Sequence, residues 1–502
     1  MPEHLIAVDV GTTAAKVGLF TLGGRLLAQA SNPYPVRHPG PDMWEQDPAH
    51  WWRAVRNGIV AVTMRGRVRP QTVRAVAVSG QTPTLVLVDA RGRAVRPAIL
   101  WRDARAVDEA RWLQAEVGPE RLRASLGMDL PIEPVYAPAK LLWLFRHELG
   151  GLRRTAAILQ PKDFINLKLT GETASDPWCS KGMVHVESGA TDPGYLEIFG
   201  LRPAHIPRMQ GASQVVGQVR PGPARELGLA PEAQVVTGWS DALCGILGTG
   251  AFASEAAFNL TGTSEIVGLS TETTPAPEPR LLSIPRAVVG GLAVAYGPNN
   301  CGGSTLDWFL RLFHDGSRMQ APAREAIIRR VARRPPAPGL LFLPYIYGER
   351  APLWDPQARG AFIGIEASHG WEDFCRAVLV GVAMSARHVL AVAAGATGAA
   401  IRSVRVGGGA ATSMGWNRIR ADVFGVPVQQ PVLTESSLLG AAMLGAIGIG
   451  AYAGFAEASQ AMVRTGFVLE PDRARATTHD EAFGRFKAAY VATRDLVHPA
   501  AG

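Results

Sequence analysis

Cysteine is scarce in this chain of 502 residues, and the four that occur lie far apart. They form neither a Cys-x-x-Cys pair nor a spacing typical of zinc ligands. This argues against a disulfide-stapled fold and a structural zinc site. We expect reduced and mostly buried thiols, as in a cytoplasmic protein. The four residues are Cys179, Cys244, Cys301 and Cys375.

Long apolar runs and blocks of one charge are also missing. No apolar stretch of roughly 18 residues appears, which predicts no transmembrane helix. The N-terminus enters a strand pattern directly, without the basic and apolar regions of a signal peptide. The net charge is +8, but arginines alternate with acidic residues, and the densest basic clusters, at 65–69 and 329–334, are short. We therefore predict neither a membrane nor a nucleic-acid partner.

What is present is an ordinary globular composition, with 47% hydrophobic and 19% charged residues. A chain of this length is too long for one compact core, so two domains are expected. Asp47 followed by Pro48 predicts the start of a helix. The segment 371–394 predicts a long amphipathic helix.

The most informative stretch, from Leu5 to Phe20, consists of two apolar strands around a polar corner. Period-2 apolarity on both sides of Gly11-Thr12-Thr13 predicts a hairpin with a tight turn. Glycine lets backbone N–H groups approach a ligand closely, and the hydroxyls add donors, which favours a phosphate site. Asp9 at the strand end could hold Mg²⁺ through water. The alternative is an ordinary hairpin with a polar turn.

The same pattern returns in the second half of the chain. Residues 257–269 repeat the apolar strand, a corner at Gly262-Thr263-Ser264 and a second apolar strand. Aligning the two corners places Asp9 opposite Leu260, so the second copy lacks the carboxylate. A repeat of this kind predicts two related halves facing across a cleft. Chance similarity of two short hairpins is the alternative.

Polar residues follow several predicted strands, which is where ligands bind in α/β sheets. Two such places are Gln81–Thr82 and Arg102–Asp103. A third is Asp241, between a strand and a helix whose N-terminus favours the ionised carboxylate. Alternatively, Asp241 is simply the N-cap of that helix.

Three glycines follow another predicted strand, at Gly407-Gly408-Gly409, and precede Ala410. Such a segment lets a flat or anionic ligand lie on the backbone. It does not match the dinucleotide-binding fingerprint, which makes that class of ligand the weaker interpretation. A flexible turn without a ligand is the alternative.

Taken in order, these segments resemble the FGGY family of carbohydrate kinases, from Ile6 to about Ala451, and most closely its xylulokinase-like branch. The matching segments are Asp9–Thr13, Trp44–Pro48, Pro97–Arg105, Pro161–Phe164, Phe342–Tyr345, Gly348–Pro352, Gly407–Ala410 with Asn417, and Glu435–Ala442.

The resemblance implies an α/β fold of two ribonuclease-H-like domains, of the actin/Hsp70/sugar-kinase type, around a central cleft. Residues 1–248 would bind the sugar and carry the catalytic aspartate, and 249–502 would bind ATP. The implied reaction is ATP-dependent phosphorylation of a hydroxyl of a small sugar or polyol, such as the pentulose D-xylulose. The implied cofactors are ATP and Mg²⁺, and a homodimer is possible.

The resemblance also assigns roles to residues. Asp241 would be the catalytic base, and Asp9 the residue that holds the metal ion. The nucleotide would contact Gly11, Thr12, Thr13, Lys16, Thr261, Gly262, Thr263, Gly408, Gly409, Ala410 and Asn417. The acceptor would contact Gln81, Thr82, Pro83, Trp101, Arg102, Asp103 and Asp241.

The chain departs from the family at positions that contact the acceptor. Xylulokinases carry Met-His and glycerol kinases Arg-Glu where this chain has Thr82-Pro83, and Pro83 offers no donor. Ala242 replaces a residue that is usually Asn or Gln, and Val380 replaces a common Glu. Since polar contacts decide discrimination in such a site, the identity of the sugar is open. An actin-like ATP-binding protein without sugar kinase activity is the alternative function.

Overall fold

The computed structural model describes residues 3–253, 255–313 and 319–498. The chain forms two compact units, each described here by itself. Unit 1 comprises Met1–Gly248 and Ser437–Met462, and unit 2 comprises Thr249–Ser436 and Val463–Gly502. The segment Ser437–Met462, which the sequence analysis placed in the second domain, therefore packs with the first unit. The predicted division of sugar and ATP binding between the two halves stays a prediction.

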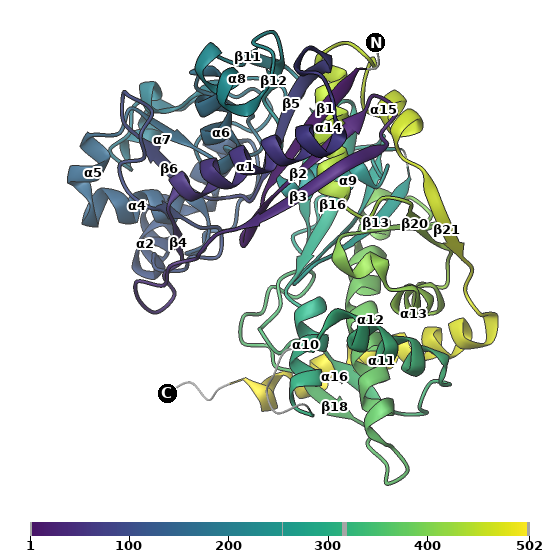
Figure 1. Ribbon diagram of the computed structural model, residues 1–502. Coiled ribbons are helices and arrows are strands. Elements are labelled where there is room, and N and C mark those ends of the chain that lie inside the picture. Colours follow the sequence, from purple (N-terminus) through teal and green to yellow (C-terminus); the bar gives the residue numbers. More distant parts are fainter. Residues whose placement is uncertain (1–2, 254, 314–318, 499–502) are drawn as a thin grey trace. The chain divides into compact units, whose positions relative to one another are not determined.

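Unit 1 is built on a six-stranded sheet (Figure 1). Its spatial order is β11 (Val215–Gln218), β12 (Gln234–Val236), β5 (Val73–Gly80), β1 (His4–Val10), β2 (Ala14–Thr21) and β3 (Leu26–Pro33). Strand β2 pairs antiparallel with both β1 and β3, whereas β1, β5 and β12 are parallel to one another. The carboxyl ends of β1, β5 and β12 therefore meet at one edge.

The alternation in β1 explains how this sheet is covered on both faces. Ile6 and Val8 lie in one hydrophobic cluster with Trp51 of α1 (Pro48–Gly66). Leu5 points to the opposite face, where it lies close to Gly445 of α14 (Ser436–Gly448). Both faces are buried, which is why the strand is apolar almost throughout. The predicted start of α1 is confirmed, because Asp47 accepts a hydrogen bond from the N–H of Ala49 at 2.9 Å.

The remaining elements of unit 1 surround this sheet. Three short strand pairs are β4 (Glu45–Gln46) with β7 (Ala98–Ile99), β6 (Val86–Val88) with β8 (Ala157–Leu159), and β9 (Ala174–Ser175) with β10 (Arg208–Met209). The other helices are α2 (Val107–Trp112), α3 (Gly118–Leu126), α4 (Ala137–His147), α5 (Leu149–Arg153), α6 (Pro161–Thr170), α7 (Pro193–Glu197), α8 (Pro221–Leu227), α9 (Asp241–Gly248) and α15 (Phe455–Met462).

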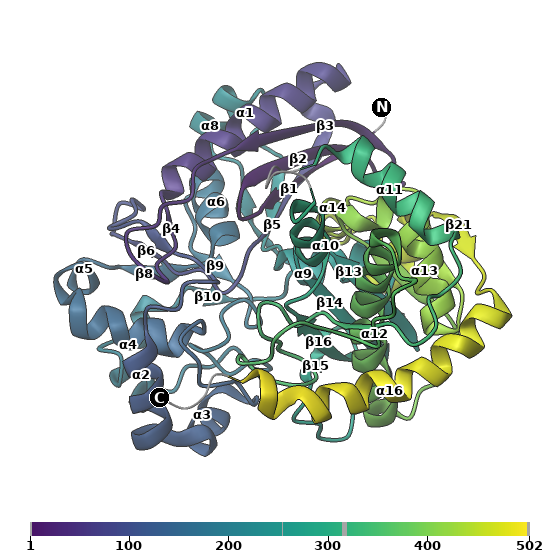
Figure 2. The same cartoon turned by 90° about the horizontal axis from the view of Figure 1, so that it is seen from below.

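Unit 2 is built on a seven-stranded sheet with the same core pattern (Figure 2). Its order is β15 (Leu282–Val289), β16 (Leu292–Asn299), β14 (Glu265–Thr271), β13 (Ala256–Thr261), β19 (Val404–Gly407), β20 (Val428–Pro431) and β21 (Thr465–Leu469). Strand β13 pairs antiparallel with β14 and parallel with β19, as β1 does with β2 and β5. The two hairpins thus hold equivalent places in two related sheets, and the repeat predicted from the sequence is more than a chance similarity.

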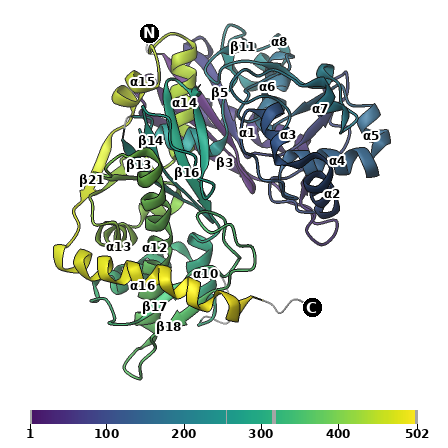
Figure 3. The same ribbon diagram turned by 180° about the vertical axis from the view of Figure 1, so that it is seen from behind.

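Helices cover the second sheet as well (Figure 3). Helices α12 (Trp371–Thr397) and α13 (Met414–Phe424) contact its strands, and α10 (Gly303–Arg311), α11 (Ala321–Arg333) and α16 (Arg473–Val497) pack against these two helices. A short strand pair is formed by β17 (Leu341–Leu343) and β18 (Ala361–Ile363). Of the helices in the described part of the chain, α12 alone is long and apolar enough to cross a membrane by length and composition. The qualifying window is 72% buried in the protein, the burial expected of a core helix, and α12 contacts α13, β14 and β16.

Candidate active site

Three neighbouring strand ends of unit 1 bring two carboxylates to one edge of the sheet. Asp9 lies at the end of β1, Ser79 at the end of β5, and Asp241 follows β12. The hydroxyl of Ser79 donates to Oδ1 of Asp9 at 2.9 Å. Ser240 forms a parallel bridge with Gly80, so the segment that carries Asp241 continues along β5. The edge is the place where α/β sheets bind ligands.

A glycine allows the chain to reach this position. Gly238 has φ +76°, and a Cβ atom there would lie 1.8 Å from the carbonyl oxygen of Val78. No other residue fits so close to the β5 backbone. The segment after β12 therefore passes directly over β5 before α9 begins.

Asp241 is the first residue of α9, but it is not the N-cap. The capping bond is made by Ser240, whose hydroxyl accepts from the N–H of Leu243 at 3.3 Å. Oδ1 of Asp241 accepts from the adjacent N–H of Ala242, at 2.7 Å. The carbonyl oxygen of Asp241 accepts from the hydroxyl of Ser437 at 3.1 Å. The carboxylate of Asp241 is therefore held in one orientation, and it is not used to cap the helix.

The surroundings of Asp241 favour its neutral form. Burial first and then the nearby charge of Asp9 raise the pKa of Asp241 from an ordinary 3.8 to about 7, against the opposing pull of Lys181. A carboxylate with a pKa near neutrality can accept a proton from a hydroxyl and release it again. Two adjacent carboxylates with one raised pKa are typical of a functional site.

The turn at Gly11, Thr12 and Thr13 has its carbonyl groups tied back. The carbonyl oxygen of Gly11 accepts from the hydroxyl of Tyr34 at 2.6 Å, that of Thr12 from Gln46 at 2.6 Å, and that of Thr13 from the N–H of Tyr34 at 3.1 Å. Among the residues that the structure describes, nothing accepts the N–H groups of Thr12 and Thr13. Such a turn presents donors only, which suits an anion.

A hydrogen-bonded chain connects this turn to the next strand end. The hydroxyl of Thr12 donates to Oε1 of Gln81 at 3.2 Å and accepts from Nε1 of Trp101 at 3.0 Å. Nε2 of Gln81 donates to Gln46 at 2.9 Å, which also accepts from Trp51 at 3.0 Å. Gln81 and Trp101, which the sequence analysis assigns to the acceptor, thus bond to Thr12, and Gln81 is only 1% exposed, so its side chain supports Thr12 and does not face a ligand. Gln46 belongs to a motif to which the sequence analysis gives no role. Its position in the motif Trp44–Pro48 is the signal that could have identified it.

Arg102 and Asp103 behave differently from each other. The guanidinium of Arg102 lies 3.7 Å from the ring centroid of Trp44, and no carboxylate within the described ranges pairs with it. Asp103 is fully buried, and its carboxylate accepts from the N–H of Trp44 at 2.6 Å and from Arg105 at 2.8 Å. Arg102 is accessible to a ligand, whereas the buried carboxylate of Asp103 bonds to Trp44 and Arg105 and does not face a ligand.

The other residues assigned to unit 1 lie close by in the chain. Thr82 and Pro83 follow β5 and are partly exposed. Lys16 is the β2 residue opposite Asp9 in the register of the hairpin.

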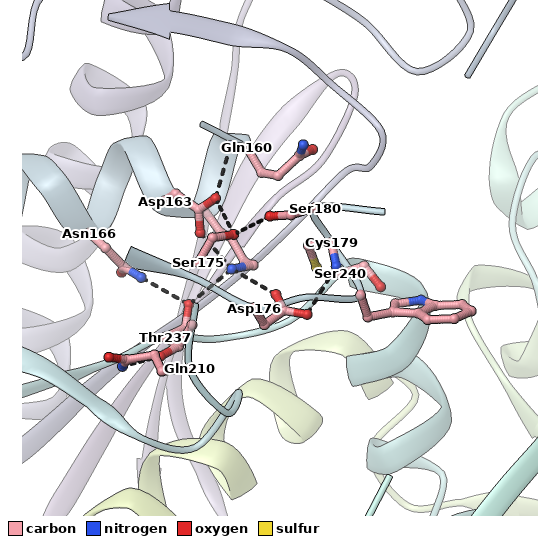
Figure 4. A network of polar contacts seen from close by, with 12 residues as sticks. Gln160, Asp163, Asn166, Ser175, Asp176, Cys179, Ser180, Gln210, Thr237 and Ser240 are labelled. Atoms are coloured by element: carbon pink, nitrogen blue, oxygen red, sulfur yellow. Dashed lines mark hydrogen bonds and ion pairs between the residues drawn. The ribbon is translucent and has the colours of Figure 1, made fainter. Parts of the chain in front are cut away.

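A buried polar network supports the segment that leads to Asp241 (Figure 4). Nζ of Lys162 lies 2.6 Å from Asp163 and 3.0 Å from Asp176. Asn166 donates to the carbonyl oxygen of Thr237 at 2.9 Å, four residues before Asp241. The sequence analysis quoted 161–164 as a motif but gave these residues no role. Because Lys162 and Asn166 both bond to the carbonyl oxygen of Thr237, their contribution is to hold the segment that precedes Asp241.

The turn after β13 in unit 2 repeats the arrangement with other partners. The carbonyl oxygens of Gly262 and Thr263 accept from the N–H groups of Gly303 and Ser304, at 2.9 and 3.1 Å, at the start of α10. In the described residues nothing accepts the N–H groups of Thr263 and Ser264. Gly262 and Thr263 are exposed. The second turn therefore also presents donors only.

The glycine segment after β19 lies beside that turn. Gly408 has φ +79°, and a Cβ atom there would lie 2.6 Å from the carbonyl oxygen of Thr261. Gly409 is exposed, and a Cβ there would meet nothing within 4 Å. By contrast, Thr261 and Asn417 are fully buried, so their side chains face the core and not a ligand.

Comparisons with known proteins show the family of this chain. Residues 4–248 match the N-terminal domain of the FGGY family of carbohydrate kinases, and residues 257–449 match its C-terminal domain. The chain belongs to this family. It is 32% identical to the xylulose kinase of Escherichia coli over 427 residues, which is 84% of each chain.

Two further relatives show how broad the similarity is. The crystal structure of xylulose kinase from Rhodospirillum rubrum matches this FGGY protein with a TM-score of 0.86 at 30% identity, over 99% of this chain and 100% of the other. The gluconokinase of Bacillus subtilis is 27% identical over 455 residues, 89% of this chain and 87% of that protein. The predicted family, the mixed α/β two-domain fold and the carbohydrate kinase class are confirmed. Relatives of both names occur, so the acceptor is a separate question.

Proposed function

We propose that this FGGY kinase transfers the γ-phosphoryl group of ATP to a hydroxyl of a small sugar or polyol, with Asp241 as the general base. The raised pKa of Asp241 beside Asp9 carries the proposal. Asp241 accepts the proton of the attacking hydroxyl as the hydroxyl oxygen bonds to the γ-phosphorus and the bond from that phosphorus to the bridging oxygen breaks, which releases ADP. A positioned base contributes about 10²–10⁴-fold to the rate. The rest of catalysis is positioning and charge neutralisation.

The two glycine turns supply the phosphate donors in this proposal. In unit 1, the N–H groups of Thr12 and Thr13 face the transferred phosphoryl group. In unit 2, the N–H group of Thr263 binds a phosphate of the nucleotide, and Gly408 to Ala410 receive the adenosine. Support comes from the carbonyl groups of both turns, which accept hydrogen bonds from the protein, so that only N–H donors face the ligand. Thr261 and Asn417 are fully buried, so they position the turns through their side chains and do not contact the nucleotide.

Asp9 fits a magnesium ion that arrives with ATP. No group of three or more His, Cys, Asp or Glu side chains within 3–253, 255–313 and 319–498 could hold a metal by itself. Mg²⁺ needs no such cage, since it commonly takes one or two carboxylates, water and substrate phosphates. Asp9 has a carboxylate already oriented by Ser79 and close enough to Asp241 to raise its pKa. When bound, the ion neutralises charge on the phosphates.

The acceptor is proposed to lie against Trp101 and Arg102, and Gln81, which is 1% exposed, supports this surface through its hydrogen bond with Thr12. D-xylulose is the first acceptor to test, because relatives at 26–32% identity carry that name. A sugar acid is the second, because Arg102 has no carboxylate partner among the described residues and a relative carries the name gluconokinase. A guanidinium is well suited to bind a carboxylate.

ADP release with Mg-ATP across ketoses, polyols and aldonates tests the proposal. Turnover on one acceptor should fall at least about 10²-fold in Asp241→Asn, and should be unchanged in Asp89→Asn, a carboxylate in an exposed turn of the same unit. If a sugar acid is the acceptor, Arg102→Gln should raise the KM for that acid. Bound ATP without turnover on any acceptor would contradict the kinase reaction proposed here.

A further inference from the structure

A buried ion pair in unit 2 has no direct access to a ligand. Arg420 of α13 and Glu265 of β14 are each 1% exposed, and Nη2 of Arg420 lies 3.4 Å from Oε1 of Glu265. Burying two charges costs several kcal/mol each in desolvation, so a pair of this kind is weak evidence for stabilisation. Its other contacts show what it does.

The guanidinium of Arg420 contacts two segments that are far apart in the sequence. Nη2 donates to the hydroxyl of Thr261 at 2.7 Å, and that hydroxyl donates to Glu265 at 2.7 Å. Nη1 donates to Oδ1 of Asn417 at 2.9 Å. Nδ2 of Asn417 in turn donates to the carbonyl oxygen of Ala411 at 2.8 Å. The contacts run without a break from the end of β13 to the turn after β19.

These two segments are the ones proposed to bind the nucleotide. Thr261 directly precedes the Gly262 turn, and Ala411 lies in the turn that begins at Gly408. The two turns already touch, because a Cβ atom on Gly408 would lie 2.6 Å from the carbonyl oxygen of Thr261. Contact alone limits how near the turns come. The hydrogen bonds of Arg420 limit how far apart they move.

We propose that the Arg420–Glu265 pair is a positioning device that fixes the separation of the Gly262 and Gly408 turns, and thereby sets the affinity for the nucleotide. The proposal rests on the proposed function, in which both turns bind ATP. Arg420, Glu265 and Asn417 are positioning residues, since no ligand can reach their buried side chains.

The competing explanation is that the pair only stabilises the fold. The double variant Glu265→Met/Arg420→Met separates the two explanations. Replacing both members of a buried pair by apolar side chains of similar size is often neutral for stability, whereas removing one leaves an unpaired buried charge. The double variant should therefore unfold near the wild-type temperature while losing the hydrogen bonds to Thr261 and Asn417.

The measurement is calorimetric titration of the whole protein with Mg-ADP and no acceptor, followed by steady-state kinetics. The dissociation constant for Mg-ADP and the KM for ATP should rise by about tenfold in the double variant, a change comparable to the loss of one hydrogen bond. The KM for the acceptor should stay constant. Arg420→Lys, which keeps the charge but loses the forked donor, should give a smaller rise and serves as the second variant if the double variant does not fold.

Asp422→Asn is the matched control on the same helix. Asp422 is fully buried, and its Oδ1 accepts from the N–H of Asp472 at 2.9 Å, away from both turns. The affinity of the Asp422→Asn variant for Mg-ADP should equal that of the wild type. Wild-type affinity in folded Arg420→Lys and in the double variant would overturn the proposal. Failure of the wild type itself to bind either nucleotide would instead overturn the proposed function.

Discussion

Lowering the pH from 8 to 6 should slow this kinase about tenfold. Burial and the charge of Asp9 raise the pKa of Asp241 to about 7. The base acts as the carboxylate, so activity requires the deprotonated form. With this pKa about nine-tenths of the protein is competent at pH 8 and about one-tenth at pH 6, and activity falls about tenfold for each further unit. An ordinary aspartate would give no change in this range.

Removing a charged neighbour of Asp241 should shift the pH at the midpoint of this activity profile, in a direction set by the sign of the neighbour's charge. Lys181 attracts the carboxylate, and Lys181→Gln should therefore move the midpoint to higher pH. The matched control is Lys168→Gln. Lys168, another lysine of unit 1, donates to the carbonyl oxygen of Gly92 at 2.8 Å. It should leave the midpoint where it is.

The assay is ADP release with both substrates well below their KM, so that the rate reports the ionisation of the free protein. A second profile at saturating Mg-ATP should have its midpoint at lower pH, because a cation near Asp9 offsets the charge that raises the pKa of Asp241. Circular dichroism across the same pH range checks that the protein stays folded. A profile that is flat from pH 8 to 6 would refute this account of Asp241.

Three further predictions concern stability. Asp241→Asn should be more stable than the wild type by an amount that grows between pH 4 and 7. The raised pKa of Asp241 means that the folded wild type loses stability as the pH rises from the unfolded to the folded pKa, whereas the neutral amide does not. The largest gain in the free energy of unfolding is about 4 kcal/mol, less for partial exposure, and urea unfolding at several pH values measures this gain. Lys162→Met should cost about 3–5 kcal/mol in the same assay at pH 7, because it leaves the buried carboxylate of Asp163 unpaired; an unchanged midpoint would contradict the network shown above. Gly238→Ala should lower the melting temperature and abolish turnover, since a Cβ atom would lie 1.8 Å from the oxygen of Val78.

The sequence predicted the fold well where local pattern and packing agree. The hairpins at Gly11 and Gly262 were recognisable because apolar alternation and a glycine corner are both local signals. The start of α1 at Asp47 was recognisable for the same reason. The path of Ser437–Met462 was not, because its apolar helix fits either sheet by composition, and only long-range packing decides which.

The sequence predicted which residues lie at the candidate site better than it predicted what their side chains contact. Asp241 was located from a strand-to-helix junction, but the pattern allowed it to be an N-cap, a role that Ser240 fills in the structure. Thr261 and Asn417 match a family motif, yet burial turns both side chains inward. Burial depends on the neighbours that tertiary structure supplies, and no single-sequence pattern contains it.

Because Ser437–Met462 packs with unit 1, the protein cannot be split into two folded halves by a single cut after Gly248. A fragment ending at Gly248 would lack α14, whose Gly440 packs on Cys244 and whose Gly445 packs on Ala77. That fragment would expose one face of its own sheet to water and would be prone to aggregate. A circularly permuted chain that keeps α14 beside β5 is the form in which this half could be produced alone. Amide protection in α14 should likewise follow that of β5, although 355 residues, 81–435, separate the two elements in the sequence.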